Sequence, residues 1–395
     1  MALVVWNGRS RQELGEQSRA LSFSLGILAE VTLFFFSPSS NTPIGGVRVI
    51  YRHVDVLNNA GIPASVVHDI PNFRCDWFEN STKVVSLPLQ VTDADVLVLP
   101  EVMNGLLTSL APGVPKVSLI QNAFVALGRS DPLRDHPYLT AKDLLVCTAI
   151  SQQNLELLEY AFPRMRFQRL HVSIDPAVFH LPERAPERRV VYMPRKLPGH
   201  SRMVLNILRS RGSLVGWDIV PIDKLSQSEV AEALRSASLF LSFCHHEGCA
   251  LPPLEALASG CCVIGYTGFG AREYFEAPDA VPVPEGDVSA FAYEVETWVN
   301  NFDPDEHWLT AKRRSEKVLS AYSPGQEAHD VVSFWRNTLP EMPKSRGTTC
   351  NITRPDVVEG SWRGLLRRSG SDLRAGMREL ATEAASTVRL WKSRS

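Results

Sequence analysis

Residues 239–266 read LFLSFCHHEGCALPPLEALASGCCVIGY, and this segment predicts a strand, a loop, a helix and a second strand in succession. The apolar run up to Cys244 is typical of a buried strand, whereas the polar residues that follow it indicate a loop. Pro252 and Pro253 suit the first turn of a helix, because a proline there loses only an N–H group that has no intrahelical partner. Gly260 is expected to end this helix, and the next apolar strand begins directly after it.

The same segment places two carboxylates at one edge of the predicted sheet. Glu247 lies in the loop after the strand and Glu255 in the first turn of the helix, with seven residues between them. Open α/β sheets bind ligands at the carboxyl ends of their strands, and the free N–H groups at the start of a helix favour phosphate. We therefore expect a site for a phosphorylated ligand at this edge.

Short apolar strands and helical segments alternate over most of the chain. Near-continuous apolar strands separated by helices indicate parallel sheets covered on both faces, and two such series predict two doubly wound, Rossmann-like domains. The expected strands are 31–36, 62–67, 96–99, 116–120 and 144–147 in the first series, and 189–193, 217–222, 239–243, 261–266 and 280–283 in the second.

The predicted fold class is therefore α/β, with two doubly wound parallel-sheet domains. The first domain is expected at 31–170 and the second at 171–338. An extension, 1–30, precedes them, and a basic helical tail, 339–395, follows them.

The composition is that of a globular protein and excludes wholesale disorder. Of the 395 residues, 44% are hydrophobic and 21% are charged, and the net charge is −2, which gives no reason to expect a nucleic-acid partner. The seven cysteines are odd in number and irregularly spaced, so we expect a reduced, cytoplasmic compartment rather than a disulfide framework. Neither a signal peptide nor a membrane span is expected, because the apolar run 20–36 is short and contains Glu30.

The tail differs from the body of the chain in charge. From Pro340 to Ser395 there are eleven basic and six acidic residues. A basic amphipathic helix can lie in a membrane interface, so residues 346–395 are a candidate for peripheral attachment to the inner face of the membrane. Packing on the protein body or on a partner is the alternative, which Glu379 and Glu383 favour. The apolar face of the predicted helix consists of Leu373, Met377, Leu380, Ala384, Val388 and Trp391.

The segment around Glu247 and Glu255 resembles the retaining GT-B glycosyltransferases of family 4, the glycosyl transferases group 1. The mark of this family is a pair of glutamates separated by seven residues in a context rich in Gly, Pro and Ala, and nearly all of that context is present in 247–260. The resemblance covers about 31–335 and includes the further segments 37–46, 173–179, 268–273 and 283–287.

The resemblance implies transfer of a sugar from a nucleoside diphosphate sugar to an acceptor, in the cleft between the two GT-B domains and with retention of configuration. The first domain would face the acceptor and the second the donor. Glu255 would hold the ribose hydroxyls, and Glu247 would contact the donor sugar and stabilise positive charge near its anomeric carbon. Donor contacts would also come from the loop after Glu247 and from a glycine-rich loop: Gly248, Cys249, Ala250, Leu251, Gly45 and Gly46.

The family holds the diphosphate with an arginine and a lysine, so the resemblance implies no metal and no other cofactor. Here Arg195 and Lys196 follow a strand and would be catalytic, because cations stabilise the charge of the leaving group. The family usually has its lysine about five residues after the arginine, where this chain has His200. Gln121 and Asn122 stand where the family often has a histidine; on this sugar and acceptor side they can hydrogen-bond but cannot act as a base.

Alternatives to this interpretation remain. The expected acceptor is a glycan or a lipid-linked saccharide, but the same fold could be a non-catalytic scaffold that binds nucleotide sugars, or a GT-B nucleotide-sugar epimerase. Cys244, His245, His246 and Cys249 could suggest zinc. We expect no metal there, because no second pair of ligands has a suitable spacing.

Overall fold

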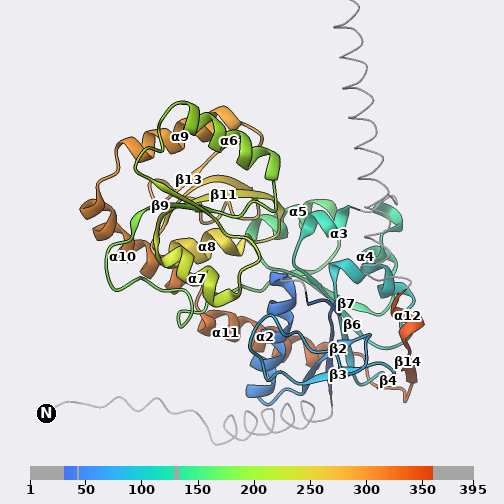
Figure 1. Cartoon of the computed structure of the whole chain (residues 1–395). Helices are drawn as coiled ribbons and strands as arrows, with labels where there is room; N and C mark the ends of the chain where they lie inside the picture. Colours follow the sequence, from blue (N-terminus) through green and yellow to red (C-terminus); the bar gives the residue numbers. More distant parts are fainter. Residues whose placement is uncertain (1–30, 42–43, 129–132, 359–395) are drawn as a thin grey trace, which may run out of the picture.

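The computed structural model describes residues 31–41, 44–128 and 133–358. Within these ranges, two parallel β-sheets form two domains that lie side by side (Figure 1). Every strand expected from the sequence is present, with ends shifted by a few residues. The expected pair of doubly wound α/β domains is therefore confirmed.

The first sheet has seven parallel strands in the order β3-β2-β1-β5-β6-β7-β8. One face is covered by α2 (Gly45–Asn59), and the other by a 3-10 helix at Glu101–Thr108 and by α5 (Gln152–Ala161). The strands are β1 (Leu33–Phe36), β2 (Ala64–His68), β3 (Val84–Ser86), β5 (Val96–Pro100), β6 (Lys116–Ile120), β7 (Leu144–Ala149) and β8 (Phe167–Arg169). The shorter elements are α3 (Ala123–Leu127), a 3-10 turn at Leu133–Asp135 and α4 (Pro137–Thr140).

The second sheet has five parallel strands in the order β10-β9-β11-β12-β13. Helices α6 and α9 cover one face, and α7, α8 and α10 cover the other (Figure 1). The strands are β9 (Glu187–Tyr192), β10 (Asp218–Pro221), β11 (Ala237–Glu247), β12 (Cys262–Phe269) and β13 (Ala280–Pro282). The helices are α6 (Pro198–Ser210), α7 (Gln227–Arg235), α8 (Leu251–Ala258), α9 (Val288–Asn300) and α10 (Pro304–Ala321).

Side-chain caps fix the starts of several helices where the sequence predicts them. The Ser151 hydroxyl accepts a hydrogen bond from the backbone N–H of Asn154 at the start of α5. Ser226 and Glu229 form a capping box at the start of α7, and Asp287 caps α9. These bonds satisfy N–H groups that lack an intrahelical acceptor, so the helix ends are specified locally.

The chain returns to the first domain after the second sheet. Helix α11 (Pro324–Thr338) buries Val331, Phe334 and Trp335 in the core beneath α2 and the first sheet. Further along, β14 (Thr349–Ile352) pairs in an antiparallel manner with β4 (Leu89–Thr92), and a short helix, α12 (Arg354–Val358), follows. The chain therefore passes between the domains twice, once from the first to the second after β8 and once back to the first at α11.

The start of the expected tail therefore differs from the helical structure predicted for it. A 3-10 turn at Leu339–Glu341 is followed by strand β14, not by a longer helix. The carboxylate of Asp93 accepts hydrogen bonds from the backbone N–H groups of Arg346 and Thr348, which fixes the chain beside β4. The extension 1–30 and the predicted tail helix from Leu373 to Trp391 lie outside the described residues. Within the residues that are described, no helix is long and apolar enough to cross a membrane.

Candidate active site

The segment from β11 to α8 lies at the boundary between the two domains. Strand β11 is central in the second sheet, between β9 and β12, and ends at Glu247. Helix α8 begins at Leu251, with prolines in its first turn, and Glu255 is a buried residue of this helix with 6% of its surface exposed. Both carboxylates therefore lie near the carboxyl end of β11, as the sequence predicts. Glu255 lies just beyond the first turn of α8, not within it as expected, because the helix already begins at Leu251.

Glu247 is paired with a lysine of the same domain. Its Oε1 atom lies 2.5 Å from Nζ of Lys196, which belongs to the loop after β9. Arg195, the preceding residue, is exposed, and the described ion pairs do not include it. One of the two predicted phosphate ligands thus contacts the predicted catalytic carboxylate.

Glu255 is paired with an arginine of the other domain. Nη2 of Arg48 lies 2.9 Å from Oε1 of Glu255, and both side chains are largely buried. Arg48 is in the first turn of α2, two residues after Gly46. We did not predict Arg48 as a site residue, although its place just after the glycine-rich loop was a signal that could have identified it.

The predicted glycines and amides come together around this ion pair. The side-chain amide of Gln121 donates a 3.0 Å hydrogen bond to the carbonyl of Gly46. A Cβ atom on Gly45 would lie 3.2 Å from Cδ1 of Leu251, and one on Gly46 would lie 3.1 Å from Oε1 of Gln121. These positions leave little room for a side chain. The two glycines predicted in a loop are therefore the first residues of α2, and this first turn approaches both Gln121 and the start of α8.

The loop after Glu247 packs directly on the first domain. The carbonyl of Gly248 accepts hydrogen bonds from Oγ of Ser151, at 2.6 Å, and from Nδ2 of Asn154. A Cβ atom on Gly248 would lie 1.6 Å from the carbonyl oxygen of Gln121, so the two backbones are in contact. Nδ2 of Asn122 also donates across the boundary, to the carbonyl of His246 at 2.7 Å.

Cys249 and Ala250 are buried, as is Gly248 before them. Both side chains are buried in the core of the second domain, and burial raises the pKa of the Cys249 thiol well above its usual range. The carbonyl of Ala250 accepts a hydrogen bond from the hydroxyl of Tyr274. These two residues can therefore contribute main-chain groups to a site, but not their side chains.

A buried carboxylate in the first domain was also missed by sequence reasoning. Glu101 follows β5 directly and is 7% exposed. Burial raises its pKa to about 7, although it accepts a 3.1 Å hydrogen bond from the backbone N–H of Gln121. It thereby positions the predicted Gln121 and Asn122 pair. A glutamate directly after an apolar strand, at the sheet edge that binds ligands, was the signal for it.

Glu273 fixes the two domains to each other. It ends the segment 268–273 and accepts hydrogen bonds from the backbone N–H of Gln152 at 2.9 Å, from Arg169 at 2.8 Å and from the hydroxyl of Tyr322 at 2.9 Å. Two of these donors belong to the first domain. The residue is therefore occupied by contacts between the domains.

Comparisons with known proteins agree with this geometry. The model of the family "Glycosyl transferases group 1" matches residues 219–315, which include both carboxylates. A curated alpha-1,6-glucosyltransferase of Actinobacillus pleuropneumoniae serotype 7 (strain AP76) is 25% identical over 283 residues, which is 65% of this chain and 80% of the relative.

Solved structures show the same fold at low sequence identity. TarM has a TM-score of 0.59 at 8% identity, over 78% of this chain and 98% of its own. Anabaena Alr3699/HepE in complex with UDP and glucose has a TM-score of 0.58 at 11% identity, and sucrose-phosphate synthase of Thermosynechococcus elongatus one of 0.57 at 13%. Each of these two likenesses covers 78% of this chain and 99% of the other. The fold is GT-B and, with the family-model match and the curated relative, the chain is a glycosyltransferase.

Proposed function

We propose that the chain is a retaining glycosyltransferase of family 4 that transfers a sugar from a nucleoside diphosphate sugar to a hydroxyl of a glycan or lipid-linked saccharide. The supporting observation is the pair of carboxylates at the carboxyl end of β11. Glu247 lies beside Lys196, and Glu255 pairs with Arg48 in the first turn of α2, which belongs to the other domain. UDP-glucose is the first donor to test, because the curated relative is a glucosyltransferase and HepE was solved with UDP and glucose.

The proposed donor site uses the two carboxylates differently. Glu255 accepts hydrogen bonds from the ribose diol, so the nucleotide takes the place of the Arg48 guanidinium at that carboxylate. Arg48 is then free to face the negative donor from the first domain. Glu247 lies closer to the sugar, where it stabilises positive charge at the anomeric carbon, while Lys196 and Arg195 face the diphosphate.

The proposed reaction balances without a protein base or a metal. The bond between the anomeric carbon and the diphosphate oxygen breaks, and its electron pair leaves with the diphosphate. The acceptor oxygen bonds to the same face of the sugar, and its proton passes to the leaving phosphate oxygen. Gln121 and Asn122 can orient hydroxyl groups there, but an amide cannot accept a proton at neutral pH.

We expect UDP-glucose to stabilise the protein against heat and to be consumed in the presence of EDTA. A ligand at 100 times its dissociation constant stabilises a fold by about 2.7 kcal/mol, which a thermal melt detects. The anomeric proton coupling of the product, measured by NMR, reports retention. Heat protection without release of UDP would indicate a binding scaffold, and conversion of the donor sugar without an acceptor would indicate an epimerase. Loss of transfer in EDTA that Mg²⁺ restores would contradict the metal-independent mechanism.

We also propose that the enzyme is cytoplasmic and that its tail binds the inner face of the membrane. The full chain should bind anionic vesicles at low salt more strongly than a variant that ends at Val358, since each Lys or Arg near such a surface contributes about 1 kcal/mol. Ending the variant there retains β14 and its pairing with β4. Vesicle sedimentation measures the difference, and equal binding of both proteins would show that the tail has another role.

A further inference from the structure

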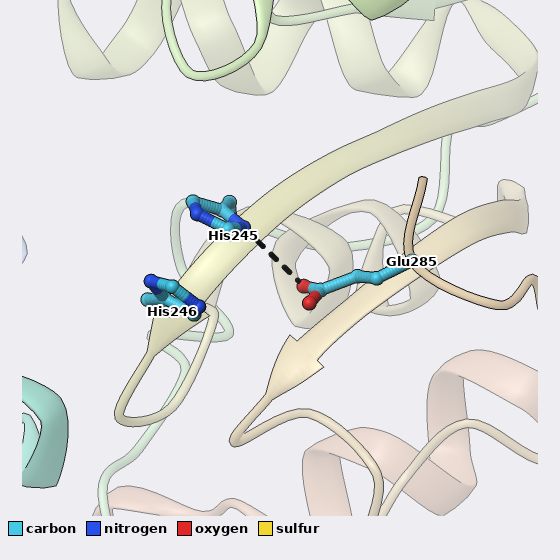
Figure 2. Close-up of side chains that lie close together, drawn as sticks. All are labelled: His245, His246 and Glu285. Atoms are coloured by element: carbon cyan, nitrogen blue, oxygen red, sulfur yellow. Dashed lines mark ion pairs between the residues drawn. The ribbon is translucent and has the colours of Figure 1, made fainter. Parts of the chain in front are cut away.

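Two exposed histidines and a glutamate converge beside the proposed site. His245 and His246 lie at the end of β11, and Glu285 lies in the loop between β13 and α9 (Figure 2). Their nearest nitrogen and oxygen atoms all lie within 4.8 Å of one another. Nδ1 of His245 is 3.7 Å from Oε1 of Glu285, and the two imidazole rings have centroids 3.6 Å apart.

The neighbouring cysteines do not belong to this cluster. The side chain of Cys244 is buried in the core of the second domain, whereas His245 and His246 are exposed. Burial raises the pKa of the Cys244 thiol to about 12, which disfavours the thiolate that a metal would need. The Cys244, His245, His246 and Cys249 set considered from the sequence is therefore divided between the core and the surface, and Glu285 completes a different set.

We infer that His245, His246 and Glu285 bind a divalent transition-metal ion of the zinc class. Imidazole nitrogen and carboxylate oxygen are ligands that zinc, cobalt and nickel accept, whereas Mg²⁺ and Ca²⁺ prefer sites made of oxygen alone. Bonds of about 2.0–2.2 Å place tetrahedral ligand atoms about 3.4 Å apart. All three residues are exposed, so their side chains can rotate by the small amount that this spacing requires.

The site lies at the boundary between the domains. The ring of His246 stacks on Phe124 of α3, with centroids 4.6 Å apart and an interplanar angle of 20°. The carbonyl of the same residue accepts the hydrogen bond from Asn122, and Glu247 follows it directly. A metal ion here would join the end of β11 to the β13–α9 loop, next to a contact between the domains. This site is additional to the proposed transfer, which uses basic side chains at the diphosphate.

Metal titration of the full chain, without a histidine tag, tests the inference. We expect Zn²⁺ and Co²⁺ to bind once per chain by calorimetry and to raise the thermal midpoint, whereas Mg²⁺ leaves both unchanged. His245→Ala and Glu285→Gln should each weaken Zn²⁺ binding by at least about tenfold, since even residues outside the first ligand shell are worth 10–100-fold in metal affinity.

His180→Ala is the matched control, because His180 is an exposed histidine that is not part of the cluster. It should bind Zn²⁺ as the unmodified chain does. Unchanged melting of every variant without metal verifies that the fold is intact. Equal Zn²⁺ affinity in all variants, no Zn²⁺ binding at all, or equal binding of Mg²⁺ would each overturn the inference. None of these measurements depends on sugar transfer, so they are independent of the proposed function.

Discussion

Glu247→Gln should reduce kcat by at least about 100-fold and leave the affinity for the donor nucleotide nearly unchanged. Removing one preorganised electrostatic group from a transition state costs about 10²–10³-fold in kcat. Glutamine keeps the shape of the side chain but removes the charge that lies 2.5 Å from Lys196. The developing positive charge on the sugar would then face an uncompensated lysine. Steady-state kinetics with UDP-glucose, together with a UDP thermal shift, separate turnover from binding.

Glu255→Gln should have the opposite profile. Its main effect is expected on donor affinity, because a neutral amide is a weaker acceptor for the ribose hydroxyls than a carboxylate. The change also releases Arg48 from its partner. Glu276→Gln is a suitable control for both variants, since Glu276 is an exposed residue that pairs with Lys317. Full transfer activity in both site variants would show that the site has been placed wrongly.

The strand, loop and helix around Glu247 could be predicted because their signals are local. The prolines at the start of α8 and the glycine after it mark both helix ends within a few residues. Gly260 has a φ of +94°, a left-handed conformation that glycine adopts at little cost, and this explains why it ends the helix there. An apolar run that is buried on both faces, such as β5, identifies a parallel strand in the same local way.

Local sequence signals could not show which distant residues contact the predicted site residues. Arg48 and Glu255 are separated by 207 positions, and Asn154 and Gly248 by 94. Periodicity indicates which face of an element is buried, but not which distant side chain covers it. Strand β14 was missed for a related reason, because its four residues become a strand only through pairing with β4.

Gly248→Ala should abolish most of the transfer activity without unfolding either domain. An added Cβ would lie 1.6 Å from the carbonyl oxygen of Gln121 and 2.6 Å from its carbonyl carbon. Both contacts are with backbone atoms, so no rotamer change can relieve them. Gly270 is also close to this loop, since a Cβ there would lie 2.0 Å from the carbonyl oxygen of Gly248. The loop must therefore shift or the domains must separate.

A shift of this size at the proposed donor loop should lower kcat/KM by about 100-fold or more, since a displacement of about 1 Å can cost 10²-fold in rate. The domain cores are formed by other residues, so the circular dichroism spectrum should be retained, while small-angle scattering should report a more open molecule. Gly325→Ala is the matched control, because a Cβ there meets no atom within 4 Å. Wild-type kinetics of Gly248→Ala would mean that the contact between Gly248 and Gln121 is absent from the active arrangement. The hydrogen bonds from Ser151 and Asn154 to Gly248 would then be present only in the protein without substrate, and not during transfer.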